Sequence, residues 1–188
     1  MARIPRARGH LTDQSYDAAP LIVTALLPKD MAAWATGLRT RHFPPERNYL
    51  SAHVTLFHAI PPSCAGELAT VLKGVATDTA PVSGRLEGIM SLGRGTALKL
   101  SSPSMLALRD RIAGRFHGSL SAQDQHRPRL HVTIQNKVSA AEAKAVQAEL
   151  APVIQPRDFA FRGIATYHYL GGPWELLREY SFRGDSRA

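Results

Sequence analysis

Two copies of one short pattern, histidine-valine-threonine-aliphatic, are the part of this sequence whose residue types could perform chemistry. The copies occupy residues 53–56 and 131–134. Each lies in a run of apolar and β-favouring residues, which predicts a strand. Because side chains alternate along a strand, the histidine and threonine of each copy share one face, and the two apolar residues share the other. The pattern therefore presents an imidazole and a hydroxyl side by side, twice.

Two such pairs suit an in-line displacement at phosphorus. Histidine titrates near neutral pH, so one imidazole can accept a proton from the attacking oxygen while the other protonates the leaving oxygen. The hydroxyls of Thr55 and Thr133 can hydrogen-bond the non-bridging phosphate oxygens. A lone His-x-Thr is commonly only a surface or core feature, and it is the duplication that favours a catalytic set of His53, Thr55, His131 and Thr133.

Metal ligands are missing from both motifs. Neither copy contains a carboxylate or a cysteine, so we expect no metal in this reaction. A metal-dependent hydrolase that uses the scattered histidines stays open as an alternative, and it predicts loss of activity in a chelator. The single cysteine, Cys64, excludes an intramolecular disulfide and a cysteine-based metal site.

The composition limits the kinds of protein that this chain can be. The chain has 188 residues, 44 % of them hydrophobic, which suffices for one domain with a real core. Its formal charge of +8 attracts polyanions such as nucleic acid, although an excess of arginine can also reflect codon usage and charged tails. No apolar run approaches the roughly 20 residues that cross a bilayer, and the first residues do not read as a secretory signal. We therefore expect no membrane partner and a cytoplasmic location.

Alternating helix and strand patterns follow one another along the chain. Residues 1–20 are expected to form a flexible arm, residues 21–183 a single domain, and residues 184–188 a loose tail. Strands are predicted over residues 21–27, 49–60, 82–92, 97–100, 130–138, 159–170 and 175–182, and helices over 29–41, 65–77, 103–117 and 140–150. Gly93-Arg94-Gly95 predicts a hairpin turn. Ser139, with Glu142 three residues later, predicts a capping box.

The order of these elements contains a weak duplication. Each motif strand is followed by a helix and then by a pair of strands. This order predicts a bilobal α+β fold, with two lobes related by a pseudo-twofold axis and an antiparallel sheet flanked by helices in each. The active-site cleft would lie between the two sheets, where the motif strands meet.

The paired motifs and their setting resemble the 2H phosphoesterase superfamily, named for two H-x-[ST]-x motifs. Within it they are similar to the bacterial RNA 2′,3′-cyclic phosphodiesterase / 2′-5′ RNA ligase-like proteins, over roughly residues 20–183. The resemblance implies that 2′,3′-cyclic phosphates are opened to 2′-phosphates, or 2′-5′ linkages hydrolysed or formed, without a metal or nucleotide cofactor. It implies an acid role for His53 and a base role for His131. Because ligation swaps the roles, that assignment stays open.

A few further residues lie close to the motifs in sequence. Phe57 shares the predicted cleft face of its strand and could stack on a base or pack in the core. Arg129 precedes the second motif and could contact a phosphate or lie in a solvated loop. His58 would face away from the cleft if its strand is regular, and Trp174 is expected to pack in the core or at an edge. His126 is interpreted as a surface residue.

The substrate is expected to be RNA or a small cyclic nucleotide, and the chain is expected to act as a monomer. A competing interpretation is an RNA-binding module that has the same fold and little catalysis. The intact set of two histidines and two threonines favours the enzyme.

Overall fold

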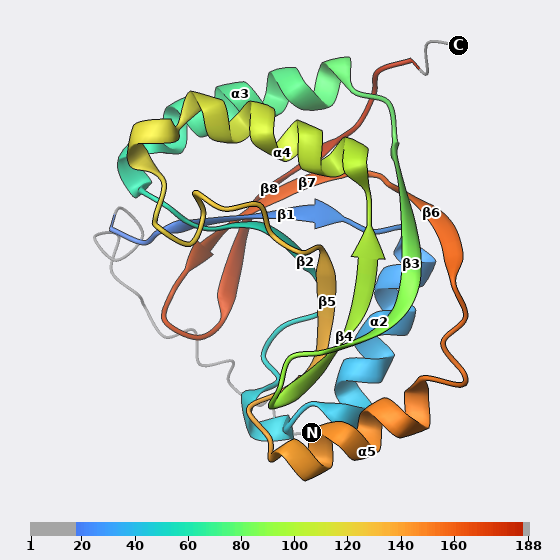
Figure 1. The fold of residues 1–188 in the computed structure, drawn as a ribbon. Helices are drawn as coiled ribbons and strands as arrows, with labels where there is room; N and C mark the ends of the chain where they lie inside the picture. The colour runs from blue at the N-terminus through green and yellow to red at the C-terminus, as the bar shows by residue number, and fades with distance from the viewer. Residues whose placement is uncertain (1–17, 186–188) are drawn as a thin grey trace, which may run out of the picture.

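Two four-stranded antiparallel sheets, with helices packed around them, make up the protein (Figure 1). The computed structural model describes residues 18–185, so residues 1–17 of the predicted arm and the last three residues of the predicted tail lie outside the described part. The elements are β1 (Leu21–Leu26), α2 (Lys29–His42), β2 (Val54–Ile60), α3 (Ala65–Asp78), β3 (Val82–Ser91), β4 (Gly95–Ser101), α4 (Pro103–Arg115), β5 (His131–Asn136), α5 (Ala140–Leu150), β6 (Arg157–Phe161), β7 (Gly163–Tyr169) and β8 (Trp174–Ser181).

The two sheets have corresponding strand orders. One runs β2-β1-β7-β8 and the other β5-β4-β3-β6. In each sheet a motif strand lies at the edge, beside the strand that precedes it in the chain, and a helix connects the two. The predicted bilobal α+β fold is therefore confirmed. An edge strand has one row of unpaired backbone groups, so both motif strands are open to contact on one side.

Two of the helices, α2 and α4, are exchanged between the two halves. Helix α2 connects the two strands β1 and β2 of the first sheet, yet it packs against β5 of the second. Helix α4 connects β4 to β5 and lies beside α3, over the first sheet (Figure 1). There the guanidinium of Arg109 stacks on the ring of Phe57 in β2, 4.6 Å from its centroid. Each motif strand is thus supported by a helix from the other half of the chain.

Local sequence signals account for several element boundaries. The Ser139 hydroxyl accepts from the Glu142 amide at 3.2 Å, and the Glu142 carboxylate accepts from the Ser139 amide at 2.8 Å, so the predicted capping box is confirmed. At the start of α4 the Ser102 hydroxyl accepts from the Met105 amide at 3.1 Å. The turn between β3 and β4 uses Gly93 at φ 76°, a conformation that glycine adopts without strain.

The predicted strand over residues 159–170 is wrong as a single element. It is two strands in different sheets, because β6 pairs with β3 and β7 pairs with β1 and β8. Arg162 lies at the break, and Gly163 begins β7 so close to β8 that a Cβ atom there would meet the Tyr180 carbonyl oxygen at 2.3 Å. A continuous β-favouring run cannot reveal such a change of sheet, since both of its halves have the composition of a strand.

No helix within residues 18–185 combines the length and the apolar character that crossing a membrane requires.

Candidate active site

The two edge strands β2 and β5 carry the motifs and contact one another between the sheets (Figure 1). His53 directly precedes β2, and His131 is the first residue of β5. All four motif side chains, His53, Thr55, His131 and Thr133, are partly exposed, whereas the valine and aliphatic residues of both motifs are buried. The alternation expected within each four-residue motif is therefore present.

Both motif histidines are held in the same way by their own strand. His53 Nδ1 lies 2.8 Å from the carbonyl oxygen of Ser51, and His131 Nδ1 lies 2.7 Å from that of Arg129. A carbonyl oxygen only accepts hydrogen bonds, so Nδ1 must carry the proton in both rings. This leaves Nε2 of each imidazole as the atom that can exchange a proton with a bound molecule.

The four side chains line two adjoining pockets in a crossed arrangement. His53 and Thr133 line a pocket of about 490 Å³, and Thr55 and His131 line a pocket of about 380 Å³. Because the members of each motif are two residues apart on one strand, the pockets adjoin along β2 and β5. Each imidazole therefore shares its pocket with the threonine of the other motif.

A β-bulge follows the threonine in both motif strands. In β2, Thr55 pairs with Thr24 but Phe57 pairs with Val23, so Leu56 is the extra residue. In β5 the equivalent bulge makes Ile134 the extra residue, between Thr133 and Gln135. A bulge interrupts the alternation of faces. Leu56 and Phe57 are consequently both buried, and so are Ile134 and Gln135.

Two sequence predictions are wrong because of the β2 bulge. Phe57 does not share the cleft face with His53 and Thr55; its exposed fraction is 0 %, and it packs in the core beneath Arg109. His58 does not face away from the cleft, because the bulge returns it to the side of Thr55, in the pocket that also contains His131. Asn136 occupies the equivalent place after the β5 bulge and lines the pocket of His53.

Arg39 is a residue of the candidate site that no sequence pattern indicates. It is only 3 % exposed, and it donates to the Thr133 carbonyl at 2.6 Å, the Leu50 carbonyl at 3.1 Å and the Asn48 side-chain oxygen at 3.1 Å. Burial lowers the pKa of Arg39 to about 10, so the guanidinium stays charged at neutral pH. A buried cation from α2 therefore joins the segment before the first motif to the strand of the second.

The surroundings of His53 disfavour its protonated form. Desolvation lowers its pKa to about 4, and the positive charges of Arg39, His131 and His58 act in the same direction, whereas the hydrogen bond to Ser51 opposes them. The indole of Trp174 contributes to this desolvation, since its ring centroid lies 4.5 Å from that of the His53 imidazole. The sequence predicts only that Trp174 packs in the core or at an edge. Its place in the site depends on the β7–β8 hairpin, which no local pattern links to His53.

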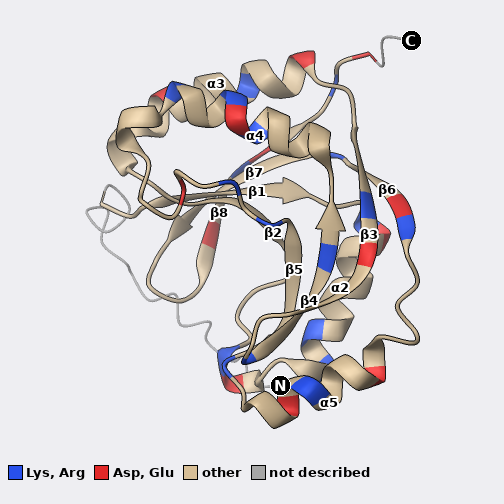
Figure 2. Ribbon diagram, viewed as in Figure 1, with Lys and Arg blue, Asp and Glu red and all other residues tan. Residues whose placement is uncertain are grey.

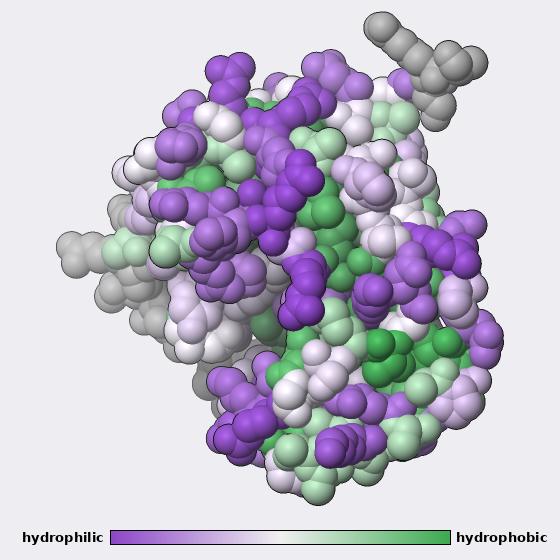
Figure 3. Space-filling model, in the orientation of Figure 1, coloured by the Kyte–Doolittle hydropathy of each residue, from purple (hydrophilic) through white to green (hydrophobic). Residues whose placement is uncertain are grey.

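The segment that leads into β5 is basic (Figure 2). Arg127 and Arg129 line the pocket of Thr55 and His131, together with His126, which was interpreted as a surface residue. On the face shown in Figure 3, hydrophilic side chains gather at the centre of the molecule, in the region where β2 and the start of β5 lie in Figure 1. Arg129 is thus placed beside His131, and its contact with a phosphate stays a prediction.

Within residues 18–185, no group of three or more histidine, cysteine, aspartate or glutamate side chains is arranged to hold a metal ion.

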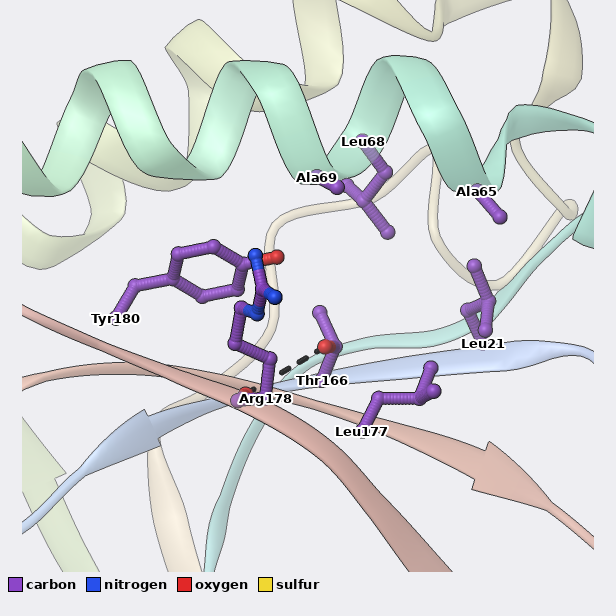
Figure 4. A pocket seen from close by; sticks show the side chains of 8 residues that line it. All are labelled: Leu21, Ala65, Leu68, Ala69, Thr166, Leu177, Arg178 and Tyr180. Atoms are coloured by element: carbon purple, nitrogen blue, oxygen red, sulfur yellow. Dashed lines mark hydrogen bonds between the residues drawn. The ribbon is translucent and has the colours of Figure 1, made fainter.

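A separate, mainly apolar pocket of about 310 Å³ lies between α3 and the first sheet (Figure 4). Leu68 of α3 and Leu177 of β8 face it, and a hydrogen bond of 3.5 Å joins the Thr166 hydroxyl to the Arg178 carbonyl on its floor. None of the motif residues lines this pocket.

Comparison with known proteins identifies similar chains. A sequence model described as the 2′-5′ RNA ligase superfamily matches residues 27–173. Among solved structures, TT0787 of Thermus thermophilus is similar with a TM-score of 0.61 and 18 % identity, covering 88 % of this chain and 99 % of that one. LigT of E. coli complexed with 3′-AMP has a TM-score of 0.60 and 16 % identity, covering 88 % of this chain and 98 % of that one. No curated protein matches the chain in sequence. At these identities the solved structures show a shared fold.

Proposed function

The chain belongs to the 2′-5′ RNA ligase superfamily, and from this premise we propose that it is a metal-independent phosphoesterase that opens 2′,3′-cyclic phosphates to 2′-phosphates. The substrates would be RNA ends or nucleotides, and the same residues could hydrolyse or form a 2′-5′ linkage. His53, His131, Thr55 and Thr133 would carry the reaction. No cofactor is part of this scheme.

One observation carries the proposal. Two imidazoles from distant parts of the chain have Nδ1 fixed on a backbone carbonyl and Nε2 left for a ligand, and each shares its pocket with the threonine of the other motif. A phosphate at the junction of the pockets would meet a proton donor or acceptor and a hydroxyl on either side. General acid–base catalysis by two positioned histidines needs this arrangement.

The low pKa of His53 favours one assignment of roles in the hydrolytic direction. A group with a pKa of about 4 is almost wholly neutral at pH 7, so His53 suits the base, which accepts a proton from the attacking water. The bond from phosphorus to the 3′ oxygen would break as His131 protonates that oxygen, leaving a 3′-hydroxyl and a 2′-phosphate. This assignment is the reverse of the one implied by the family resemblance. The threonine hydroxyls would donate to the non-bridging oxygens.

Turnover of a nucleoside 2′,3′-cyclic phosphate in the presence of EDTA tests the proposed function. We expect the 2′-phosphate to form at an unchanged rate after chelation, because the reacting groups are side chains of the protein. Loss of turnover in EDTA, with recovery on adding a divalent metal, would support the metal-dependent hydrolase instead. Binding of RNA without turnover of any cyclic phosphate or 2′-5′ linked substrate would support the binding module.

The pH dependence of kcat/KM tests the low pKa of His53, on which the assignment of roles rests. If His53 is the base, kcat/KM should rise with pH through about 4 as this residue becomes neutral in the free protein, and fall at higher pH as the acid loses its proton. If His53 were the acid, only about one molecule in a thousand would be correctly protonated at pH 7. An acid limb centred near the ordinary histidine pKa of about 6.5 would contradict the lowered pKa of His53 and so remove the reason for assigning it as the base.

A further inference from the structure

A third imidazole lies in the same pocket as Thr55 and His131. The side chain of His58 is 42 % exposed, and the pocket that it lines also contains Arg127 and Arg129. The reaction outlined above assigns no task to any of these three residues. The three basic side chains lie together in this pocket, next to the place proposed for the reacting phosphate.

The orientation of His58 is set by a buried carboxylate. Asp124 is 1 % exposed, and its Oδ1 lies 3.0 Å from His58 Nδ1. The same carboxylate accepts from the His58 amide at 2.9 Å, the Ala59 amide at 2.9 Å and the Ser121 hydroxyl at 3.1 Å. Although burial opposes ionisation, the hydrogen bonds from His58 and Ala59 keep the pKa of Asp124 below its usual value. An ionised carboxylate only accepts hydrogen bonds, so His58 Nδ1 carries a proton and Nε2 is left for a ligand.

Asp124 also holds the basic segment that precedes β5 next to His58. Its side chain binds the backbone of β2, and its own carbonyl oxygen accepts from Arg109 of α4. Arg127 follows three residues later and donates through Nε to Asp110 of α4 at 2.7 Å. One residue therefore fixes His58 and the start of the segment that carries both arginines. His58 and Arg127 are therefore held in place by contacts within the protein.

We propose that His58, Arg127 and Arg129 form a second phosphate subsite, which binds the phosphate next to the one that reacts. The inference rests on the proposed function and deepens it. Protonated, His58 can donate from Nε2 to a phosphate oxygen while Nδ1 stays on Asp124, and arginine guanidinium groups are suited to the same acceptor. A nucleoside 2′,3′-cyclic phosphate has no group to fill this subsite. The cyclic end of an RNA has one, the phosphodiester on its 5′ side.

The test compares two substrates, a nucleoside 2′,3′-cyclic phosphate and the same compound with a 5′-phosphate. We expect the wild-type protein to prefer the 5′-phosphorylated compound by about 10-fold or more in kcat/KM, the scale of one charge-assisted hydrogen bond. His58→Gln and Arg129→Gln should each reduce this preference several-fold. The ratio of the two substrates is the measured quantity, because a general effect on the reacting phosphate cancels in it.

The matched control is His117→Gln, which alters an exposed histidine that lines none of the pockets described above. It should keep the wild-type preference. Asp124→Asn should reduce the preference as well, and thermal unfolding will show whether this buried substitution also disturbs the fold. Retention of the full preference by His58→Gln, or a wild-type protein without any preference, would overturn the subsite.

Failure of the subsite and failure of the proposed function give different results. If neither compound is turned over, the proposed function fails, and the subsite is then decided by equilibrium binding of the two compounds. Tighter binding of the 5′-phosphorylated compound to the wild-type protein than to His58→Gln would support the subsite. Equal binding of this compound to both proteins would refute it.

Discussion

Replacing either motif histidine with alanine should reduce kcat/KM for a nucleoside 2′,3′-cyclic phosphate by about 10²- to 10⁴-fold, the contribution typical of one positioned acid or base. His53 and His131 are each held through Nδ1 by a carbonyl oxygen, so alanine removes the Nε2 atom that is proposed to react and leaves the backbone hydrogen bonds of the strands in place. Initial rates measured by separation of the cyclic and opened nucleotides will report the loss.

Combining the two substitutions sharpens this experiment. Groups that act as a unit are not additive, so the double variant should lose little more than the worse single variant. His117→Ala provides the control for removal of an exposed histidine elsewhere. The motif side chains are partly exposed, so thermal unfolding should change little in the single variants. Full activity in either His53→Ala or His131→Ala would refute the catalytic set.

Arg39→Ala should lower both activity and stability, because this buried guanidinium links the two motifs. Its loss leaves the Thr133 and Leu50 carbonyls without their donor, and hydrogen bonds to a charged group contribute about 1.5–3 kcal/mol each. We expect the free energy of unfolding to fall by about 3 kcal/mol, and kcat/KM by about 10²-fold, because a small displacement of Thr133 misplaces its hydroxyl. Denaturant titration and initial rates measure the two effects.

The pH profile separates a positioning role of Arg39 from a merely structural one. Its positive charge lowers the pKa of His53, so removing it should raise that pKa and move the acid limb of kcat/KM to higher pH. Arg39→Lys retains the positive charge but not the planar set of donors. Its acid limb should therefore lie near the wild-type pH, while its free energy of unfolding should stay below the wild-type value. Arg41→Ala, an exposed arginine on the same helix, is the control and should change neither. An unmoved acid limb in Arg39→Ala would contradict the electrostatic effect on His53.

Several features of this protein could be predicted from the sequence because they are encoded by neighbouring residues. The alternation within each motif identifies which side chains share a face, and His53 and His131 lie at the starts of the two edge strands, where that alternation places them beside their threonines. The capping box of Ser139 and the glycine turn at Gly93 depend on three or four adjacent residues. The duplicated order of elements predicted two similar lobes, and the corresponding strand orders confirm them.

The remainder of the site depends on pairings between residues that are far apart in the chain. The bulge at Leu56 exists only in the register of β2 against β1, and it decides that Phe57 is buried and that His58 reaches the pocket. Arg39 reaches Thr133 only because α2 crosses to the other sheet. A single-residue shift in pairing reverses the face of every later side chain, and no local pattern records which distant strand will impose it. The two motifs and the strands that carry them follow from neighbouring residues, whereas pairings between distant strands decide which further side chains surround the motifs.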